Sequence, residues 1–128
     1  MKVKEIAFVC YAIENVPKAR EFYEKFLSLV PTQNWESEEY TFIEYSFGPE
    51  GSHTLALGKG APNFKPGKSG ATVALEVEDF DGAVATLKSN SVPFILEPQD
   101  TPVCHMALVA DPDGNQIMIH KRKEDKKA

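Results

Sequence analysis

The 128-residue sequence has few cysteines, no long apolar run and no excess of basic residues, and each absence excludes a class of protein. Its two cysteines, Cys10 and Cys104, form no Cys-x-x-Cys pair, which favours reduced thiols in a cytoplasmic protein over a disulfide framework. No run approaches the about 18 apolar residues of a membrane-spanning helix. With 14 basic and 19 acidic side chains the net charge is −5. We therefore expect no membrane partner and no nucleic-acid partner.

Motifs of nucleotide binding and of nucleophilic catalysis are also missing. The sequence contains no Gly-x-Gly-x-x-Gly, and Gly-Lys-Ser at residues 67–69 lacks the upstream glycine and the following helix of a phosphate-binding loop. No nucleophile-elbow motif marks a catalytic serine. The remaining composition, 42% hydrophobic and 26% charged, is that of an ordinary globular domain with a sizeable core.

What the sequence does contain is an internal repeat. Gly-Pro-Glu-Gly-Ser at residues 48–52 and Asp-Pro-Asp-Gly-Asn at residues 111–115 each precede an apolar strand, about 62 to 64 residues apart. An apolar strand and an amphipathic helix precede each turn in the same order. We therefore predict one domain built from module one (1–58), a Gly/Pro/Lys-rich joint (59–69), module two (70–121) and a charged tail (122–128) that frays into solvent.

The elements of the two modules follow from periodicity and from capping residues. Asn15 and Asp79 are the expected helix N-caps, and the first helix should present an inward face that includes Val30. The predicted helices span residues 16–30 and 80–90, and the predicted strands span residues 5–13, 40–47, 54–58, 71–77, 94–96, 105–110 and 115–121, with a loop or short strand near Trp35.

The sequence resembles the vicinal oxygen chelate superfamily in three segments. These are the first strand (5–13), the helix start at residues 15–23 (Asn-Val-Pro-Lys-Ala-Arg-Glu-Phe-Tyr) and the turn at residues 111–115. This group includes glyoxalase I, extradiol (ring-cleaving) dioxygenases, fosfomycin-resistance enzymes and bleomycin-binding proteins. The resemblance covers nearly the whole chain. It implies an α+β fold in which two βαβββ modules form a cup-shaped mixed sheet with helices on the outer face, and it implies a homodimer. It does not specify one reaction.

The resemblance also implies four metal-ligand positions, which hold His, Glu or Gln in the family's enzymes. Here they are Phe8, Thr72, Met118 and either Ala56 or, if the first turn has no extra residue, Leu55. Hard or borderline cations need carboxylate or imidazole ligands, and a thioether suits Cu(I). We therefore predict no metal at the family position and no cofactor.

Strand alternation predicts which side chains line the cup. With a type I turn and a bulge at Gly114, Asp111 should oppose Asn115, and Met106 should oppose His120. The predicted ligand-binding residues are Phe8, Cys10, Phe42, Glu44, Ala56, Thr72, Met106, Met118 and His120. Further predicted lining residues are Ile6, Ser46, Thr54, Ala74, Glu76, Cys104, Leu108 and Gln116. The predicted helix-facing residues are Ile43, Tyr45, Phe47, Leu55, Leu57, Ala107, Val109, Ile117 and Ile119.

Each polar residue of this cup has a structural alternative. Glu44 and His120 are the catalytic candidates, yet Glu44 is merely exposed if the first hairpin shifts by one residue, and His120 precedes a solvated basic run. Glu76 reads as a rim charge. Cys10 is either a nucleophile with His120 as its base or a small buried hydrophobe.

Two more histidines, His53 and His105, are expected at the surface. The aromatic residues Trp35, Tyr40, Phe8 and Phe42 supply either a face for a flat or cationic ligand or core packing.

These observations predict a protein that binds a small organic molecule without metal, in the manner of the bleomycin-resistance branch. The first alternative is an enzyme, a lyase or isomerase of glyoxalase type. It would use a metal relocated to Glu44, Glu76 and His120, or metal-free acid/base residues. The second is a dimer with a filled cup and an interaction role.

Overall fold

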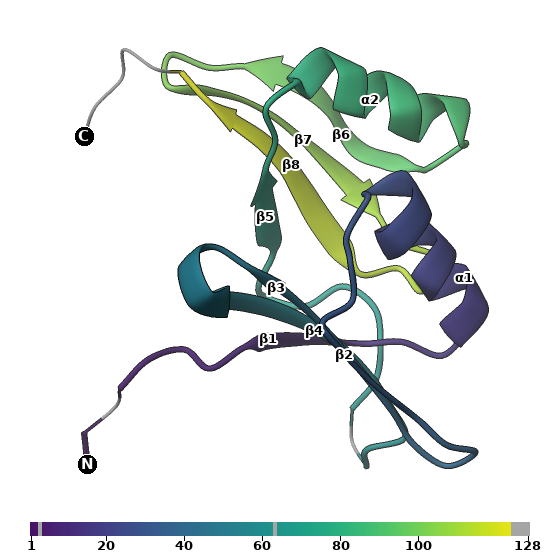
Figure 1. Ribbon diagram of the computed structural model, residues 1–128. Coiled ribbons are helices and arrows are strands. Elements are labelled where there is room, and N and C mark those ends of the chain that lie inside the picture. The colour runs from purple at the N-terminus through teal and green to yellow at the C-terminus, as the bar shows by residue number, and fades with distance from the viewer. Residues whose placement is uncertain (3, 63, 124–128) are drawn as a thin grey trace. The chain divides into compact units, whose positions relative to one another are not determined.

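The computed structural model describes residues 1–2, 4–62 and 64–123 of the chain (Figure 1). The chain divides into two compact units, Met1–Pro66 and Gly67–Ala128, with the division inside the predicted joint. Each unit is described here by itself. Among the described residues, no helix is long and apolar enough to cross a membrane.

The first unit contains a four-stranded mixed sheet and one helical segment. In chain order its elements are β1 (Val9–Ala12), α1 (Val16–Arg20), the π-helix η1 (Glu21–Phe26), β2 (Gln33–Glu36), β3 (Thr41–Phe47), the 3-10 helix η2 (Pro49–Gly51) and β4 (His53–Lys59). The strand order is β1-β4-β3-β2. β1 runs parallel to β4, and the other two pairs are antiparallel.

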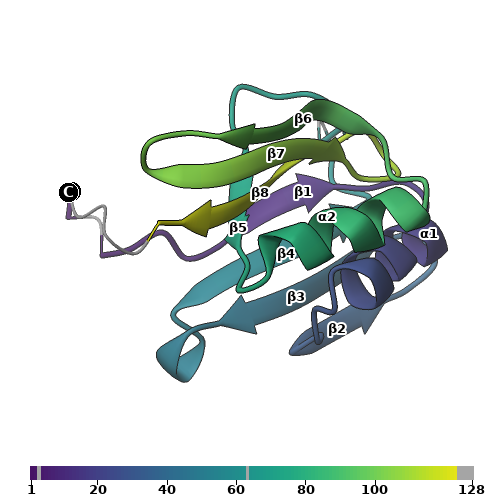
Figure 2. The same cartoon turned by 90° about the horizontal axis from the view of Figure 1, so that it is seen from above.

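The second unit repeats this plan. Its elements are β5 (Val73–Glu76), α2 (Phe80–Ser89), β6 (Phe94–Asp100), β7 (Cys104–Ala110) and β8 (Gln116–Arg122). The order β5-β8-β7-β6 again has one parallel pair, β5 with β8 (Figure 2). The predicted α+β class with two βαβββ modules is therefore confirmed, as two four-stranded mixed sheets.

Each helix packs on one face of the sheet in its own unit. Tyr23 of η1 stacks on Tyr45 of β3 with ring centroids 6.2 Å apart, and the Tyr45 hydroxyl donates to Glu24 at 2.8 Å. In the second unit, Phe80 of α2 contacts the His105 ring of β7. The residues predicted to face the helices are buried, except that Phe47 is only half-buried: Ile43, Tyr45, Leu55, Leu57, Ala107, Val109, Ile117 and Ile119. Strand alternation therefore predicted both cores.

The helix starts were predicted correctly, whereas the end of the first helix was not. Asn15 accepts a hydrogen bond from the Lys18 amide at 3.0 Å, and Asp79 accepts one from the Gly82 amide at 2.9 Å. The predicted helix at residues 16–30 ends four residues early, at Phe26. Its second half is a π-helix, which shifts the side-chain period away from 3.6. Val30 lies beyond the end of this helix, is 75% exposed and does not join the predicted inward face.

Several strand limits also differ from the prediction. β1 begins at Val9 instead of residue 5, because only residues 9–12 pair with β4. β6 continues past residue 96 to Asp100, with two register shifts against β7. The predicted charged tail does not begin at residue 122, since Arg122 ends β8 and the Lys123 amide donates to Val103 at 3.0 Å. Residues 124–128 of that predicted tail lie outside the described residues.

Candidate functional site

The candidate site is the open face of each sheet, opposite its helix. The predicted registers are correct: Glu44 pairs with Ala56, and His120 pairs with Met106. The family's ligand position in β4 is Ala56 and not Leu55, because Ala56 pairs with Cys10 as Met118 pairs with Ala74. Leu55 is instead buried on the helix side.

Several aromatic rings lie on the open face of the first unit. The Phe8 and Phe42 rings meet edge to face, with centroids 5.6 Å apart and an interplanar angle of 74°. Because β4 lies between β1 and β3, this contact spans β4 above the sheet. Trp35 pairs with Phe42 and is 66% exposed, so it continues the aromatic surface onto β2. Such faces suit flat or cationic ligands.

Phe64 adds a fourth aromatic ring, which the sequence reasoning did not assign to the site. A Cβ atom added at Gly58 would lie 3.1 Å from Cε2 of Phe64 and 3.2 Å from Sγ of Cys10. Glycine at position 58 therefore allows the Phe64 ring to approach β4 closely. The one available signal was that Phe64 is the single aromatic residue in the joint at 59–69.

Cys10 and Glu44 both lie in the Ala56 row of this face. Desolvation by burial, and secondly the charge of Glu44, raise the pKa of the Cys10 thiol to about 11. The thiolate is the nucleophilic form of cysteine. The structure therefore favours the reading of Cys10 as a small, half-buried hydrophobe over the reading as a nucleophile.

The open face of the second unit is arranged in three rows across β5, β8 and β7. The first row is polar, since Gln116 donates from Nε2 to Oγ1 of Thr72 at 2.7 Å. The middle row is apolar, with Met118 between Ala74 and Leu108. The third row places His120 between Glu76 and Met106. A small apolar patch thus lies between two polar rows, as is usual for small-molecule sites.

Glu76 and His120 form a hydrogen-bonded pair in the third row. Nδ1 of His120 lies 2.6 Å from Oε1 of Glu76, and the other oxygen of Glu76 accepts from the Arg122 amide at 2.7 Å. Desolvation opposes ionisation of Glu76, but the hydrogen bonds and charges of Arg122 and His120 outweigh it and lower the pKa of Glu76. The His120 side chain is 21% exposed, so it is not the solvated strand end that one reading predicted.

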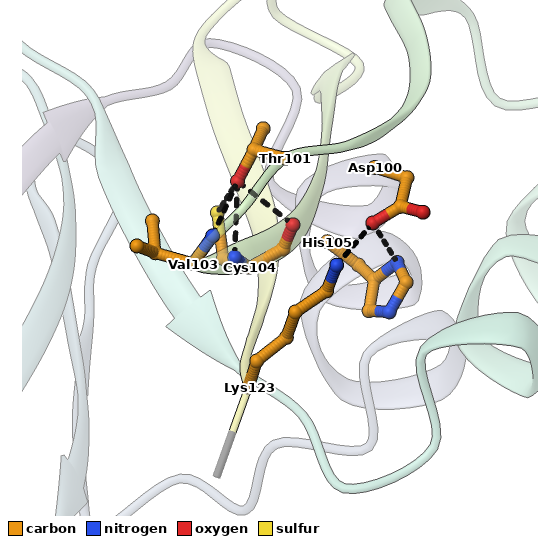
Figure 3. A network of polar contacts seen from close by, with 6 residues as sticks. All are labelled: Asp100, Thr101, Val103, Cys104, His105 and Lys123. Carbon is orange, nitrogen blue, oxygen red and sulfur yellow. Dashed lines mark hydrogen bonds and ion pairs between the residues drawn. The ribbon is translucent and has the colours of Figure 1, made fainter. Parts of the chain in front are cut away.

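The other histidines lie away from this face. His53 is exposed at the start of β4. His105 pairs with Lys121 in the register, which puts it on the opposite side from Met106 and His120. Its Nδ1 lies 3.7 Å from Oδ1 of Asp100 (Figure 3). Neither is brought together with the predicted site residues of its own unit.

A structural network closes the β6–β7 hairpin (Figure 3). Oγ1 of Thr101 accepts from the amides of Val103 and Cys104 and donates to the Cys104 carbonyl at 3.0 Å. Asp100 pairs with Lys123, whose hydrogen bond and charge lower the pKa of that carboxyl. Cys104, predicted to line the cup, is buried at this end beside Thr101.

The residues present do not fit the metal of the family's enzymes. Phe8, Ala56, Thr72 and Met118 offer neither a carboxylate nor an imidazole at the four implied positions. Throughout residues 1–2, 4–62 and 64–123, no three His, Cys, Asp or Glu side chains come together as a metal-binding group. The pair Glu76–His120 supplies two donors, fewer than the three protein ligands of a typical catalytic zinc site.

Comparison with known proteins identifies the family. Residues 5–119 match the Glyoxalase/Bleomycin resistance protein/Dioxygenase superfamily. The chain belongs to this superfamily. The chain is similar in sequence to the uncharacterized protein YetH of Bacillus subtilis (strain 168), with 27% identity over 124 residues. The match covers 91% of this chain and 98% of YetH.

Several solved structures share the fold of this chain. TnmS3, an antibiotic binding protein from Streptomyces sp. CB03234, matches with a TM-score of 0.76 and 22% identity over 96% of this chain and 99% of its own. The trypanothione-dependent glyoxalase I of Leishmania major matches with a TM-score of 0.74 and 24% identity over 93% of this chain and 87% of its own. At these identities the likeness shows the fold alone.

Proposed function

We propose that this superfamily member binds a small organic molecule with a flat, apolar body on the open faces of its sheets, without the metal of the family's enzymes. The observation that carries the proposal is the set of side chains at the four implied ligand positions. Phe8, Ala56 and Met118 are apolar and Thr72 is a neutral hydroxyl, so none of the four positions supplies a metal ligand. Ala56 is fully buried, whereas the exposed Phe8 and Thr72 and the half-buried Met118 offer contact area to a ligand.

The surroundings of these positions support the same function. Phe8 and Phe42 present a pair of aromatic rings. Met118 lies in an apolar row, and its flexible thioether side chain can adapt to irregular ligands. Glu44 and the net charge of −5 favour a cation over an anion. TnmS3, with the same fold, is an antibiotic binding protein, and the superfamily's name includes bleomycin resistance. A homodimer in the cytoplasm is part of the proposal, with no nucleic-acid or membrane partner.

A titration with the planar aromatic cation proflavine tests the proposal. Binding is measured by quenching of Trp35, the single tryptophan, which neighbours Phe42 on this face. We expect the same affinity with and without a chelator. Phe42→Ala should weaken binding about ten-fold through loss of aromatic contact. Phe94→Ala is the matched control, because Phe94 is an aromatic strand residue that pairs with the helix-facing Val109.

Two outcomes would overturn the proposal. One is a stoichiometric divalent metal in protein purified without chelator, together with loss of binding when that metal is removed. The other is equal weakening by Phe42→Ala and Phe94→Ala, which would show that the aromatic face is not where the probe binds.

A further inference from the structure

Glu76 and His120 form an oriented acid–base pair. Neither the family's metal site nor the apolar patch around Met118 requires such a pair. The two residues lie 44 positions apart in the sequence, on the parallel strands β5 and β8. Glu76 itself is fixed, because its second oxygen accepts from the Arg122 amide. A carboxylate only accepts hydrogen bonds, so Nδ1 of His120 carries the proton and Nε2 is left as the basic nitrogen.

Nothing in the described part of the chain hydrogen-bonds to Nε2 of His120. The contact of the ring with Glu76 involves Nδ1, and the side chain remains 21% exposed on the open face. The charged groups facing the ring are Glu76 from β5 and Arg122 two residues along β8. β7 presents the uncharged Met106. An oriented imidazole with a free basic nitrogen is the arrangement of a general base or hydrogen-bond acceptor.

The residues beside the His120 ring indicate what kind of ligand would donate a proton to it. Met106 lies opposite His120 and Met118 lies two residues before it, and both are half-buried on the same face. Methionine sulfur makes favourable contacts with aromatic rings. The surface therefore combines apolar side chains that can contact an aromatic ring with one proton acceptor, Nε2 of His120, at their edge.

We propose that Nε2 of His120, oriented by Glu76, is the proton acceptor for an acidic hydroxyl, a phenol or enol, on an aromatic or conjugated ligand. The inference rests on the proposed small-molecule function and names the ligand class for the second unit. The O–H bond of the ligand breaks, its proton forms a bond to Nε2, and the ligand's oxyanion remains beside an imidazolium whose Nδ1–H is held by Glu76. No other reactant is required.

The test compares 4-nitrophenol with 4-nitroanisole, which has the same ring but no hydroxyl hydrogen. The titration is run at a pH where free 4-nitrophenol is protonated, so that phenolate absorbance reports proton transfer on the protein. We expect 4-nitrophenol to bind with phenolate absorbance, and about ten-fold more tightly than 4-nitroanisole.

Variants assign the effect to the pair. His120→Asn keeps a donor near Glu76 but removes Nε2, so it should abolish the phenolate signal and make the two affinities equal. Glu76→Gln should weaken the preference several-fold, because the imidazolium loses its partner. His105→Asn is the matched control on the opposite side of the sheet and should leave both signals unchanged.

The outcomes separate this inference from the proposed function. Equal binding of both probes by the unmodified protein, or a phenolate signal that survives His120→Asn, would overturn the role of the pair and leave small-molecule binding standing. If neither nitro-aromatic probe binds at millimolar concentration while proflavine still binds, the role of the pair is wrong and small-molecule binding stands; if proflavine does not bind either, both proposals are wrong.

Discussion

Asp111 and Asn115 hold the two ends of the β7–β8 turn together through buried side chains, 3% and 2% exposed. Oδ1 of Asp111 accepts from the amides of Asp113 and Asn115, and its Oδ2 accepts from Nδ2 of Asn115 at 2.9 Å. Asn115 in turn accepts from the Gly67 amide at 3.0 Å. The turn sequence that marks the family thus fixes both the hairpin and the start of the second unit.

Asp111→Ala should therefore destabilise the protein strongly. Three N–H groups lose their acceptor, two of them on the buried Asn115, and each such loss costs about 1 to 3 kcal/mol. We expect the free energy of unfolding, measured in urea, to fall by about 3 kcal/mol. Asp81→Ala, at an exposed position of α2, should cost well under about 1 kcal/mol. Similar losses in the two variants would contradict the role of the turn.

Gly58 and Phe64 should be coupled in a double-mutant cycle. The added Cβ of Gly58→Ala would press on Phe64 and Cys10, so we expect a loss of about 1 kcal/mol in the free energy of unfolding. In a Phe64→Ala background the same substitution should cost clearly less, because only the contact with Cys10 remains. An equal cost in both backgrounds would show that Phe64 does not lie against Gly58.

The Cys10 thiol should alkylate slowly. With its pKa raised to about 11, little thiolate exists at about pH 8, and iodoacetamide should modify Cys10 about two orders of magnitude more slowly than free cysteine. Glu44→Gln removes the smaller of the two causes and should raise the rate less than ten-fold. Glu50→Gln, in the exposed turn, is the control and should not change it. Peptide mass spectrometry separates Cys10 from Cys104, and a free-cysteine rate at Cys10 would refute the prediction.

Glu76 should make a pH-dependent contribution to stability. Its pKa in the folded protein lies below the ordinary 4.5, so its hydrogen bonds stabilise the fold above that pH. This stabilisation is lost as the pH falls through the folded-state pKa. We expect Glu76→Gln to lower the free energy of unfolding by less than about 1 kcal/mol at pH 7, since the group is half exposed.

At an acidic pH, below the folded-state pKa of Glu76, the difference between Glu76→Gln and the unmodified protein should shrink towards zero. Glu78→Gln, at an exposed position just after β5, is the control at both pH values. A difference for Glu76→Gln that is the same at both pH values would mean that the charge of Glu76 is not the stabilising feature.

Sedimentation velocity tests the homodimer that the family resemblance implies. We expect a dimer at micromolar concentration, with a sedimentation coefficient that falls on dilution only at much lower concentration. A monomer throughout the micromolar range would contradict this part of the proposal.

The sequence determined the topology and the two cores. Period-two alternation in β7 and β8 placed Val109 and Ile117 under the helix, and the glycine of the Asp-Pro-Asp-Gly-Asn turn, whose φ is 88°, set the hairpin register. These features are local, because a pleated strand and a tight turn depend on neighbouring residues. The same register placed Glu44 beside Ala56.

Only the tertiary structure decided what the candidate site contains. Sequence reasoning placed Glu76 and His120 on one face and left each with a functional and a structural reading. It did not predict their hydrogen bond, because a hydrogen bond across 44 residues depends on strand pairing and side-chain rotamers. The same holds for Phe64, which approaches Gly58 from a joint without periodicity. Alternation fixes the side of a sheet on which a residue lies, whereas packing fixes what that residue touches.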